Sequence, residues 1–393
     1  MSNKNPISYR NVGDYLIPNL VLSPEEASVT LGKWGMLHKD YLLNHKKVLF
    51  ATLLTQGKLY QHCAEIEKQA NETFDMLVAK AKVECQWSES TVKKHNTFRN
   101  HLMYFAPKTR FAEWDEDMIN RFIVFEGKKL KMMDSSVQKD VKMLKWFLRR
   151  AMEIGAKVPL DFLNFRHKFK LIEKEVVFLN WDELIKLYNF DVPEEGTVVR
   201  LKDISGSVYK KVVMNRSSLL KTRDLFCFCA FTGLRYSDMA ALRRTDITSD
   251  FINVITEKTD CTLKVPLNAY SRAILQKYED ERYPGNLALP VITNQKMNEY
   301  LKDLCEICGF NTPIKYSYYR GRIRYDEVYP KWQLLGTHGA RRTFICVALE
   351  LGVPTTVIRK ITGHANEAAM RPYIAITDKT IREAMDLFSR RGV

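Results

Sequence analysis

Apolar residues recur at helical spacing along most of this chain. Between residues 38 and 81 they follow one another at near-helical intervals on both sides of Gly57. The stretch before this pattern contains three prolines and predicts a loop (Pro6, Pro18 and Pro24). Because residues 1–83 have few apolar residues for a large core, we expect them to form a small helical accessory module.

Three further helical patterns lie within residues 84–170. Ser88 is a plausible N-cap of the first helix, which Pro107 ends, and Asp115 and Ser135 begin the second and third. In each helix the apolar residues share one face, which is typical of a helix that packs against others. The pattern predicts a small domain built from helices.

The remainder, residues 171–393, mixes helices with short alternating segments. Helices are predicted from Trp181, from Ser217 and over the chain after Thr337, the last of them at residues 378–389.

Two segments rich in β-branched residues, 251–257 and 262–267, predict a hairpin whose turn is formed by residues 258–261. Residues 314–329 also alternate as β-structure does. The chain is therefore expected to be mainly α with a small β-sheet.

The net charge of the chain limits the classes of partner that it is expected to bind. The net charge is +15 and the pI is about 9.3, which favours a polyanion, either nucleic acid or an anionic membrane. No apolar run approaches the roughly 18 residues that a membrane span needs, and the N-terminus has no secretory signal. Eight cysteines are ordinary for a reduced cytosolic protein. We expect a cytoplasmic protein that handles nucleic acid and does not bind a membrane.

Metal and nucleotide chemistry have little support. Cys305 and Cys308 are spaced like a metal-binding pair, but they fall in a helical pattern and no second pair completes a tetrahedral set. We interpret them as buried cysteines. The sequence has no glycine-rich phosphate loop and no acidic cluster of the kind that two-metal nucleases use. No metal and no cofactor is expected.

Residues 84–170 contain 18 basic and 11 acidic residues. Several of the basic residues form a row along the third predicted helix. Such a row is also typical of an ordinary solvent-exposed helix face. The positive charge of the whole chain favours a face that binds phosphates instead. The expected DNA contacts are Lys93, Lys94, Lys139, Lys142, Lys145 and Arg149.

Basic and imidazole residues also gather late in the chain. His338 and Arg341 are three residues apart at the start of a predicted helix, whose free N–H groups favour an anion. Arg235 lies between Gly233, which should end one helix, and Ser237, which can cap the next. Each feature alone is weak evidence for catalysis.

His364 follows a glycine at a predicted helix boundary, and Tyr373 lies nine residues further on. In order, the chain contains the segments TGLRYSDMAAL, TEKTDCTLKVPL, GTHGARRTF and ITGHANEAAMRPYIAI. Together these segments resemble the tyrosine recombinases of the phage integrase family, in particular integrases of mobile elements of the Bacteroidetes type. The resemblance covers about residues 84–393.

This resemblance implies a helical core-binding (SAM-like) domain at residues 84–170 and an α/β tyrosine-recombinase catalytic domain at residues 171–393. The two domains would form a C-shaped clamp around DNA. Six residues match the positions of the family's catalytic residues: Arg235, Lys258, His338, Arg341, His364 and the nucleophile Tyr373. Lys258 is the least secure of them, because Lys264 lies on the neighbouring strand.

The chemistry of such a site is consistent with these residue types. A phenol is a weak nucleophile at neutral pH, so dense positive charge is expected to lower its pKa. Arg235 and Arg341 would hold the non-bridging phosphate oxygens, and His364 would donate one more hydrogen bond. His338 would accept the tyrosine proton and Lys258 would protonate the departing 5′-oxygen. The tyrosyl ester conserves the bond energy, so neither ATP nor metal is required.

Residues 7–83 resemble a different protein, the small transposon-encoded TnpV, in the phrases GDYLIPNL, LGKWGMLHKDYLLNH and LLTQGKLYQHCAEIEKQA. This second resemblance indicates a mobile element and leaves the role of the segment open.

The expected function is a site-specific DNA recombinase, or integrase, of a mobile element that acts through a covalent 3′-phosphotyrosyl intermediate. The partners implied are double-stranded DNA at attachment sites, a homotetramer at synapsis formed from free monomers, and accessory DNA-bending or excision factors. The helix at 378–389 would pack on its own domain or on a neighbouring subunit. Two alternatives are a type IB topoisomerase-like enzyme and a non-catalytic DNA-binding protein on an integrase scaffold. The presence of all six residues argues against the second.

Overall fold

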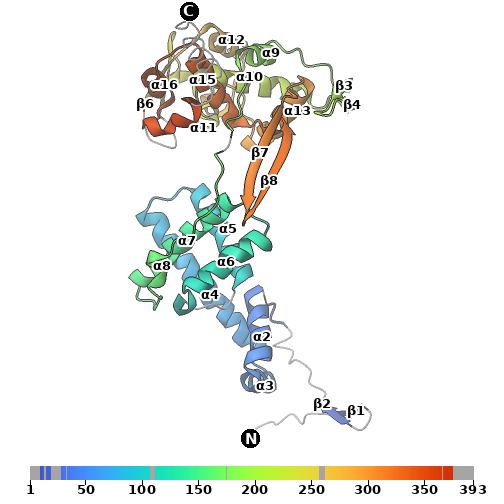
Figure 1. Ribbon diagram of the computed structural model, residues 1–393, viewed down its shortest axis with the longest axis vertical. Helices are drawn as coiled ribbons and strands as arrows, with labels where there is room; N and C mark the ends of the chain where they lie inside the picture. The colour runs from blue at the N-terminus through green and yellow to red at the C-terminus, as the bar shows by residue number, and fades with distance from the viewer. Residues whose placement is uncertain are drawn as a thin grey trace, which may run out of the picture. The chain divides into compact units, whose positions relative to one another are not determined.

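Two compact units make up the computed structural model. The first is formed by residues 1–172 with 318–325, and the second by residues 173–317 with 326–393. Helices dominate both units, and the strands form separate two-stranded sheets (Figure 1). The expectation of a mainly α chain with a little β-structure is confirmed. The structure describes residues 9–12, 15–18, 28–31, 33–106, 111–173, 175–255, 262–364 and 366–374.

A short hairpin begins the first unit, where β1 (Tyr9–Val12) pairs antiparallel with β2 (Tyr15–Pro18). The sequence predicted a loop here, which was wrong, because strands of four residues are too short to show an alternating pattern. Three helices follow and enclose a small core. They are α2 (Lys33–His45), α3 (Lys47–Thr55) and α4 (Leu59–Glu84), around Leu42, Leu59 and Cys63.

The three helices predicted after residue 84 are present as α5 (Glu89–Phe105), α6 (Glu116–Lys128) and α7 (Asp134–Glu153). Ser88 and Asp115 cap the first two as expected, since their side-chain oxygens accept backbone N–H groups at 3.4 and 2.8 Å. The third helix begins one residue before Ser135, and no side chain caps it. A 3₁₀ turn, η1 (Phe111–Glu113), and a short helix, α8 (Asp161–Asn164), complete this part.

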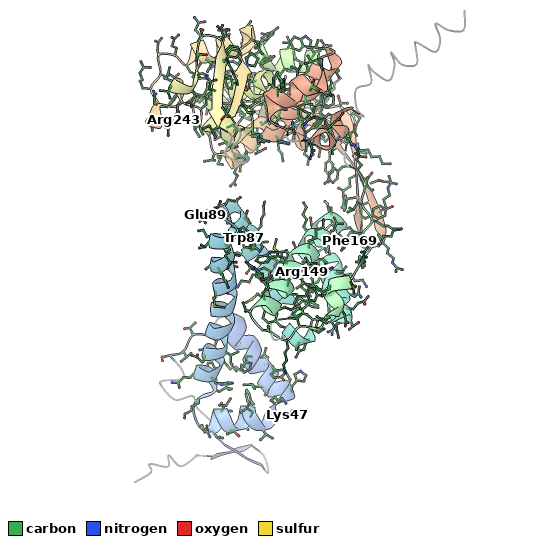
Figure 2. All side chains as sticks on the ribbon, turned by 90° about the vertical axis from the view of Figure 1, so that its left-hand side faces the viewer. Lys47, Trp87, Glu89, Arg149, Phe169 and Arg243 are labelled. Carbon is green, nitrogen blue, oxygen red and sulfur yellow. The ribbon has the colours of Figure 1, made fainter. Side chains whose placement is uncertain are left out.

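Aromatic rings join these helices. Phe98 of α5 stacks on Phe147 of α7 with ring centroids 5.8 Å apart, and it meets Phe122 of α6 edge-on at 6.3 Å. Trp87, labelled in Figure 2, stacks on His95 with centroids 3.9 Å apart. Rings buried together in this way fix the positions of α5, α6 and α7 relative to one another.

A buried helix, α10 (Arg216–Thr232), occupies the centre of the second unit. Its apolar run, residues 225–231, is fully enclosed. Around it lie α9 (Trp181–Tyr188), α12 (Ala269–Lys277), α13 (Asn294–Ile307) and α15 (Thr337–Glu350). None of the described helices has the length and apolar character that a membrane crossing needs.

Three hairpins lie between residues 198 and 330. β5 (Phe251–Ile255) pairs with β6 (Thr262–Pro266), as predicted, and β7 (Pro313–Arg320) pairs with β8 (Ile323–Pro330). The hairpin of β3 (Val198–Lys202) and β4 (Val208–Val212) was not predicted. The burial of both strands alternates, but each strand has only five residues and its sequence pattern is broken by a pair of like residues, Val198–Val199 and Lys210–Lys211. The predicted turn at 258–261 lies outside the described residues.

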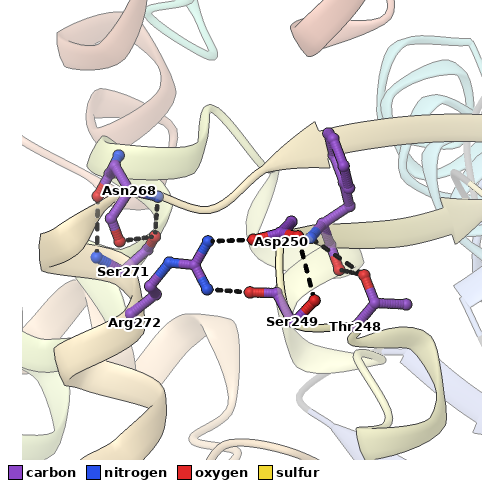
Figure 3. A network of polar contacts seen from close by, with 7 residues as sticks. Thr248, Ser249, Asp250, Asn268, Ser271 and Arg272 are labelled. Atoms are coloured by element: carbon purple, nitrogen blue, oxygen red, sulfur yellow. Dashed lines mark hydrogen bonds and ion pairs between the residues drawn. The ribbon is translucent and has the colours of Figure 1, made fainter.

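Polar contacts anchor the start of β5 to α12 (Figure 3). Arg272 of α12 donates to Asp250 at 3.0 Å and to the Ser249 carbonyl oxygen. The same helix is capped reciprocally, since Asn268 and Ser271 each accept the other's backbone N–H at 3.0 Å. These contacts fix one end of the β5–β6 hairpin.

Helices follow the last hairpin, as the sequence predicted. They are α14 (Lys331–Leu334), then α15, α16 (Thr355–Thr362) and α17 (Arg371–Ile374), with a 3₁₀ turn η4 (Glu367–Ala369) before α17. Two more 3₁₀ turns, η2 (Arg244–Asp246) and η3 (Pro284–Asn286), lie earlier in the unit. The helix predicted at 378–389 lies outside the described residues.

Candidate active site

Arg341 is the most deeply buried charged side chain at the site, with 1% of its surface exposed. It lies on α15, as predicted. One guanidinium nitrogen donates to the Gly233 carbonyl oxygen at 2.9 Å, and the other donates to the Thr362 carbonyl oxygen. Burial and the charge of Arg235 lower its pKa to about 10, so it remains charged at neutral pH. The structure therefore holds a buried cation without a carboxylate against it.

Two glycines allow the chain ends to meet around this arginine. Gly233 ends α10 and Gly363 ends α16, with φ values of 73° and 65°. A Cβ atom on Gly233 would lie 2.7 Å from the Phe344 ring, and one on Gly363 would lie 3.0 Å from Leu263. Both positions therefore require glycine for backbone conformation and for space.

His364 is oriented by the end of α16. Its Nδ1 lies 2.7 Å from Thr362 Oγ1 and 3.4 Å from a nitrogen of Arg341. The Thr362 hydroxyl also lies 2.6 Å from the Ile358 carbonyl oxygen. Burial and the nearby arginines lower the pKa of His364 to about 4. The ring is therefore neutral at pH 7.

Arg235 completes the positive group. Its guanidinium lies 3.7 Å from the buried Asp238 carboxylate, and its Nη1 is buried with no hydrogen-bond partner among the described residues. Its positive charge lowers the pKa values of both Arg341 and His364. Arg235 itself is the N-cap residue of α11 (Tyr236–Ala240), so the expectation that Ser237 caps this helix was wrong.

Tyr373 is almost fully buried on α17, with 8% of its surface exposed. It packs in a cluster with Ile345, Cys346 and Met370. Burial raises the pKa of its phenol, although the charges of Arg342 and Arg341 oppose this rise. Positive charge lowers this pKa, as expected, but burial outweighs the two arginines and the net change is upward.

Arg342 is the residue that the sequence analysis missed. The family match left this position outside the catalytic set, yet its side chain hydrogen-bonds Tyr373 and lowers the pKa of the phenol more than any other charge. The doublet of arginines in GTHGARRTF was the available signal. Adjacent helical residues point in different directions, so the two arginines serve different groups.

Of the remaining predicted catalytic residues, the structure describes only His338. His338 lies exposed in the first turn of α15 and close enough to His364 to lower its pKa. Lys258 lies outside the described residues. Lys264 is exposed on β6, with its ammonium over the Phe251 ring, 4.1 Å from the centroid. The structure thus brings Arg235, His338, Arg341, His364 and Tyr373 into one part of the second unit.

Five of the six residues expected to bind DNA have exposed side chains: Lys93, Lys94, Lys139, Lys142 and Arg149, the last of which Figure 2 labels. Lys145 differs from them. Its ammonium donates to the carbonyl oxygens of Phe165 and Leu163 at 3.1 and 3.4 Å, and burial and Arg149 lower its pKa. Lys145 therefore holds the chain after α8 against α7.

Cys305 and Cys308 are buried at the end of α13, as interpreted from the sequence. Burial raises the pKa of both thiols, that of Cys308 to about 11.

Three families of known proteins match the chain. Residues 207–380 match the phage integrase family, residues 69–166 match the phage integrase SAM-like domain, and residues 8–107 match the transposon-encoded protein TnpV. The second and third matches overlap over α4 and α5. No curated protein sequence matches the chain.

Solved structures of integrases share the fold. A lambda integrase dimer bound to a COC′ core site is 13% identical with a TM-score of 0.56, covering 80% of this chain and 95% of its own. The Tn1549 transposon integrase in complex with circular intermediate DNA is 14% identical with a TM-score of 0.54, covering 79% and 98%. A lambda integrase tetramer bound to a Holliday junction is 14% identical with a TM-score of 0.55, covering 76% and 78%.

Proposed function

Since residues 207–380 carry the domain of the phage integrase family, we propose that this chain is a site-specific DNA recombinase of a mobile element. It cuts and rejoins DNA strands through a covalent bond between Tyr373 and a 3′-phosphate. Residues 171–393 form the catalytic domain, residues 84–170 the domain that grips the DNA core site, and residues 1–83 the TnpV-like segment.

The observation that carries this proposal is the uncompensated positive charge around Arg341. Arg341, Arg235 and His364 lie together, and the nearest carboxylate, that of Asp238, is 3.7 Å from Arg235. Nη1 of Arg235 is buried and, beyond this long ion pair, makes no hydrogen bond among the described residues, so it can still donate to an acceptor. A phosphodiester supplies two charged non-bridging oxygens, which two guanidinium groups bind well.

The reaction follows from these placements. The Tyr373 oxygen attacks phosphorus and the bond to the 5′-oxygen breaks, while Arg235 and Arg341 stabilise the charge on the non-bridging oxygens. The phenol proton passes to His338, and Lys258 donates a proton to the leaving 5′-oxygen. Rejoining reverses these steps with a 5′-hydroxyl from another strand.

His364 adds one more donor to this group. Its Nδ1 contacts Thr362 and Arg341, so Nε2 is the ring nitrogen that donates to a phosphate oxygen.

The partners are those of the related integrases whose structures contain DNA. The exposed lysines of α5 and α7 contact the duplex backbone, and four copies of the chain assemble on two recombining sites. Accessory DNA-bending or excision factors assist this assembly. The reaction takes place in the cytoplasm, where the element's DNA lies.

The test uses Tyr373→Phe and a nicked suicide substrate built on the ends of the mobile element. The wild-type chain should form an adduct that survives a denaturing gel, and the variant should bind the same DNA equally well and form none. Tyr316→Phe, a change on β7, is the matched control and should leave the adduct unchanged. An adduct in Tyr373→Phe would overturn the assignment.

A further inference from the structure

A buried cluster of a different kind lies between α5, α6 and α7. It consists of His101, Glu126 and Asp140, one residue from each helix. His101 Nδ1 lies 2.7 Å from Asp140 Oδ2 and 3.3 Å from Glu126 Oε1. One ligand atom of each residue lies within 4.8 Å of the other two. The cluster is separate from the catalytic residues, which belong to the second unit.

Glu126 is the unusual member. Its side chain is fully buried, and its nearest basic group is the single imidazole of His101, 3.3 Å from Oε1 and shared with Asp140. Phe122 and Ile123, one turn earlier on α6, belong to the apolar core. A buried carboxylate without partners is costly, so a cation or a proton must neutralise it.

Two carboxylates share this cluster with one imidazole, and no lysine or arginine of the described residues is paired with them. A divalent cation in the same place would balance two carboxylates and accept a lone pair from the imidazole as well.

We propose that His101, Glu126 and Asp140 form a binding site for a divalent transition metal ion, for which Zn²⁺ is the best match. Imidazole nitrogen combined with carboxylate oxygen suits Zn²⁺ better than the all-oxygen shells that Mg²⁺ and Ca²⁺ prefer. Three protein ligands leave a fourth position for water. His101 and Asp140 retain 23% and 15% exposure of their side chains, which provides a path for the ion.

A metal ion at this site would stabilise the packing of the helices and would take no part in the recombination chemistry. A single ion bound by α5, α6 and α7 would join the three helices that carry the exposed lysines. Metal that binds only the folded chain stabilises it by mass action. Strand cleavage by the second unit would need no metal.

The experiment uses the full chain, stripped of metal with a chelator, and Zn²⁺ alone as the probe. Calorimetry should show one ion per chain, and thermal unfolding should shift to higher temperature as Zn²⁺ is added. Co²⁺ in place of Zn²⁺ should give the visible absorption of a low-symmetry site with nitrogen and oxygen ligands.

Glu126→Gln is the decisive variant, because glutamine keeps the size and the neutral state of the protonated acid and so keeps the fold. It should weaken Zn²⁺ binding by more than about 100-fold, since even outer-shell partners of metal ligands contribute 10–100-fold. Asp117→Asn, an exposed acid on α6, is the matched control and should bind Zn²⁺ as the wild type does.

Two results would overturn the proposal. One is the absence of saturable Zn²⁺ binding by a folded wild-type chain. The other is binding that Glu126→Gln leaves unchanged but Cys305→Ser with Cys308→Ser removes, which would place the ion on the thiols of α13.

Discussion

Two of the buried polar clusters among the described residues have opposite signs. Around Arg341, guanidinium and imidazole groups gather without a carboxylate close enough to neutralise them all. Around Glu126, two carboxylates gather beside one imidazole, with no lysine or arginine paired to them in the part of the chain that the structure describes. Each cluster contains two buried atoms that make no hydrogen bond among the described residues, Arg235 Nη1 and Asp238 Oδ2 in the first and the two carboxylate oxygens of Glu126 in the second.

The opposite signs point to different ligands for the two clusters. A cation left without an acceptor fits a phosphate, and a carboxylate left without a donor fits a metal ion or a proton. The predictions below test whether the positive cluster behaves as a phosphate site, from the largest expected effect to the smallest.

The largest effect should come from Arg341→Lys, because lysine retains the charge but cannot form a planar fork with phosphate oxygens. Single-turnover cleavage should fall by at least about 10³-fold, the range for arginines that stabilise phosphoryl transfer. Zn²⁺ binding by Glu126 and its partners should be unaffected. Arg235→Lys, at a less buried position, should show a comparable loss if Arg341→Lys destabilises the fold. Cleavage within tenfold of wild type by both variants would refute the phosphate site.

The second test separates proton transfer from charge stabilisation. Lys258→Ala should slow cleavage of ordinary DNA by about 10²–10⁴-fold and be nearly normal on a substrate with sulfur as the 5′-bridging atom. A thiolate leaves without a proton, whereas an alkoxide does not. Arg341→Ala should show little such rescue.

Lys264→Ala is the control for this test. Its ammonium lies over the Phe251 ring, so cleavage of both substrates should be near normal. Rescue of Lys264→Ala by sulfur would move the acid to the other strand of the hairpin, and rescue of neither lysine variant would exclude both.

A third test concerns Arg342 and the nucleophile. Arg342→Gln removes the charge that most lowers the pKa of Tyr373, so the pKa should rise further. Cleavage at neutral pH should fall by about tenfold for each unit of that rise and recover as the pH increases toward the new pKa. Single-turnover rates measured over a pH series give the shift directly. Arg371→Gln, an exposed change on α17, should leave the pH profile in place.

The smallest effect concerns the exposed basic row, whose charges differ from those at Arg341 because solvent ions screen them. Lys142→Glu with Arg149→Glu should weaken DNA binding and flatten its dependence on salt by about 0.9 per lost phosphate contact. Fluorescence anisotropy over a salt series measures both quantities. Lys145→Ala should change stability and leave this slope unaltered, because its ammonium bonds to carbonyl oxygens. A slope that the double variant leaves unaltered would make this face ordinary solvated surface.

Most of the helices could be predicted from the sequence because their apolar stripes and caps are local signals. Ser88 and Asp115 cap helices where expected. The β3–β4 and β1–β2 hairpins could not be predicted, since strands of four or five residues with a broken pattern carry too little signal.

The candidate site was predictable as a set of residue types but not as a set of contacts. Position-by-position matching found Arg235, Arg341 and His364, which the structure brings together. It could not find that Arg342 contacts Tyr373 or that burial would raise the phenol pKa. Both depend on how deeply α17 packs against α15, and packing depth is a property of the folded chain alone.

The hydrogen bonds that hold Arg341 keep its charge available for a phosphate. The carbonyl oxygens of Gly233 and Thr362 lie at the C-terminal ends of α10 and α16, where the helix dipoles are negative. These dipoles stabilise the guanidinium without neutralising it, as a carboxylate would. They are also fixed, so no side chain must move aside when phosphate arrives. The full positive charge thus stays preorganised, and the electrostatic work of creating it is done when the protein folds, before any DNA binds.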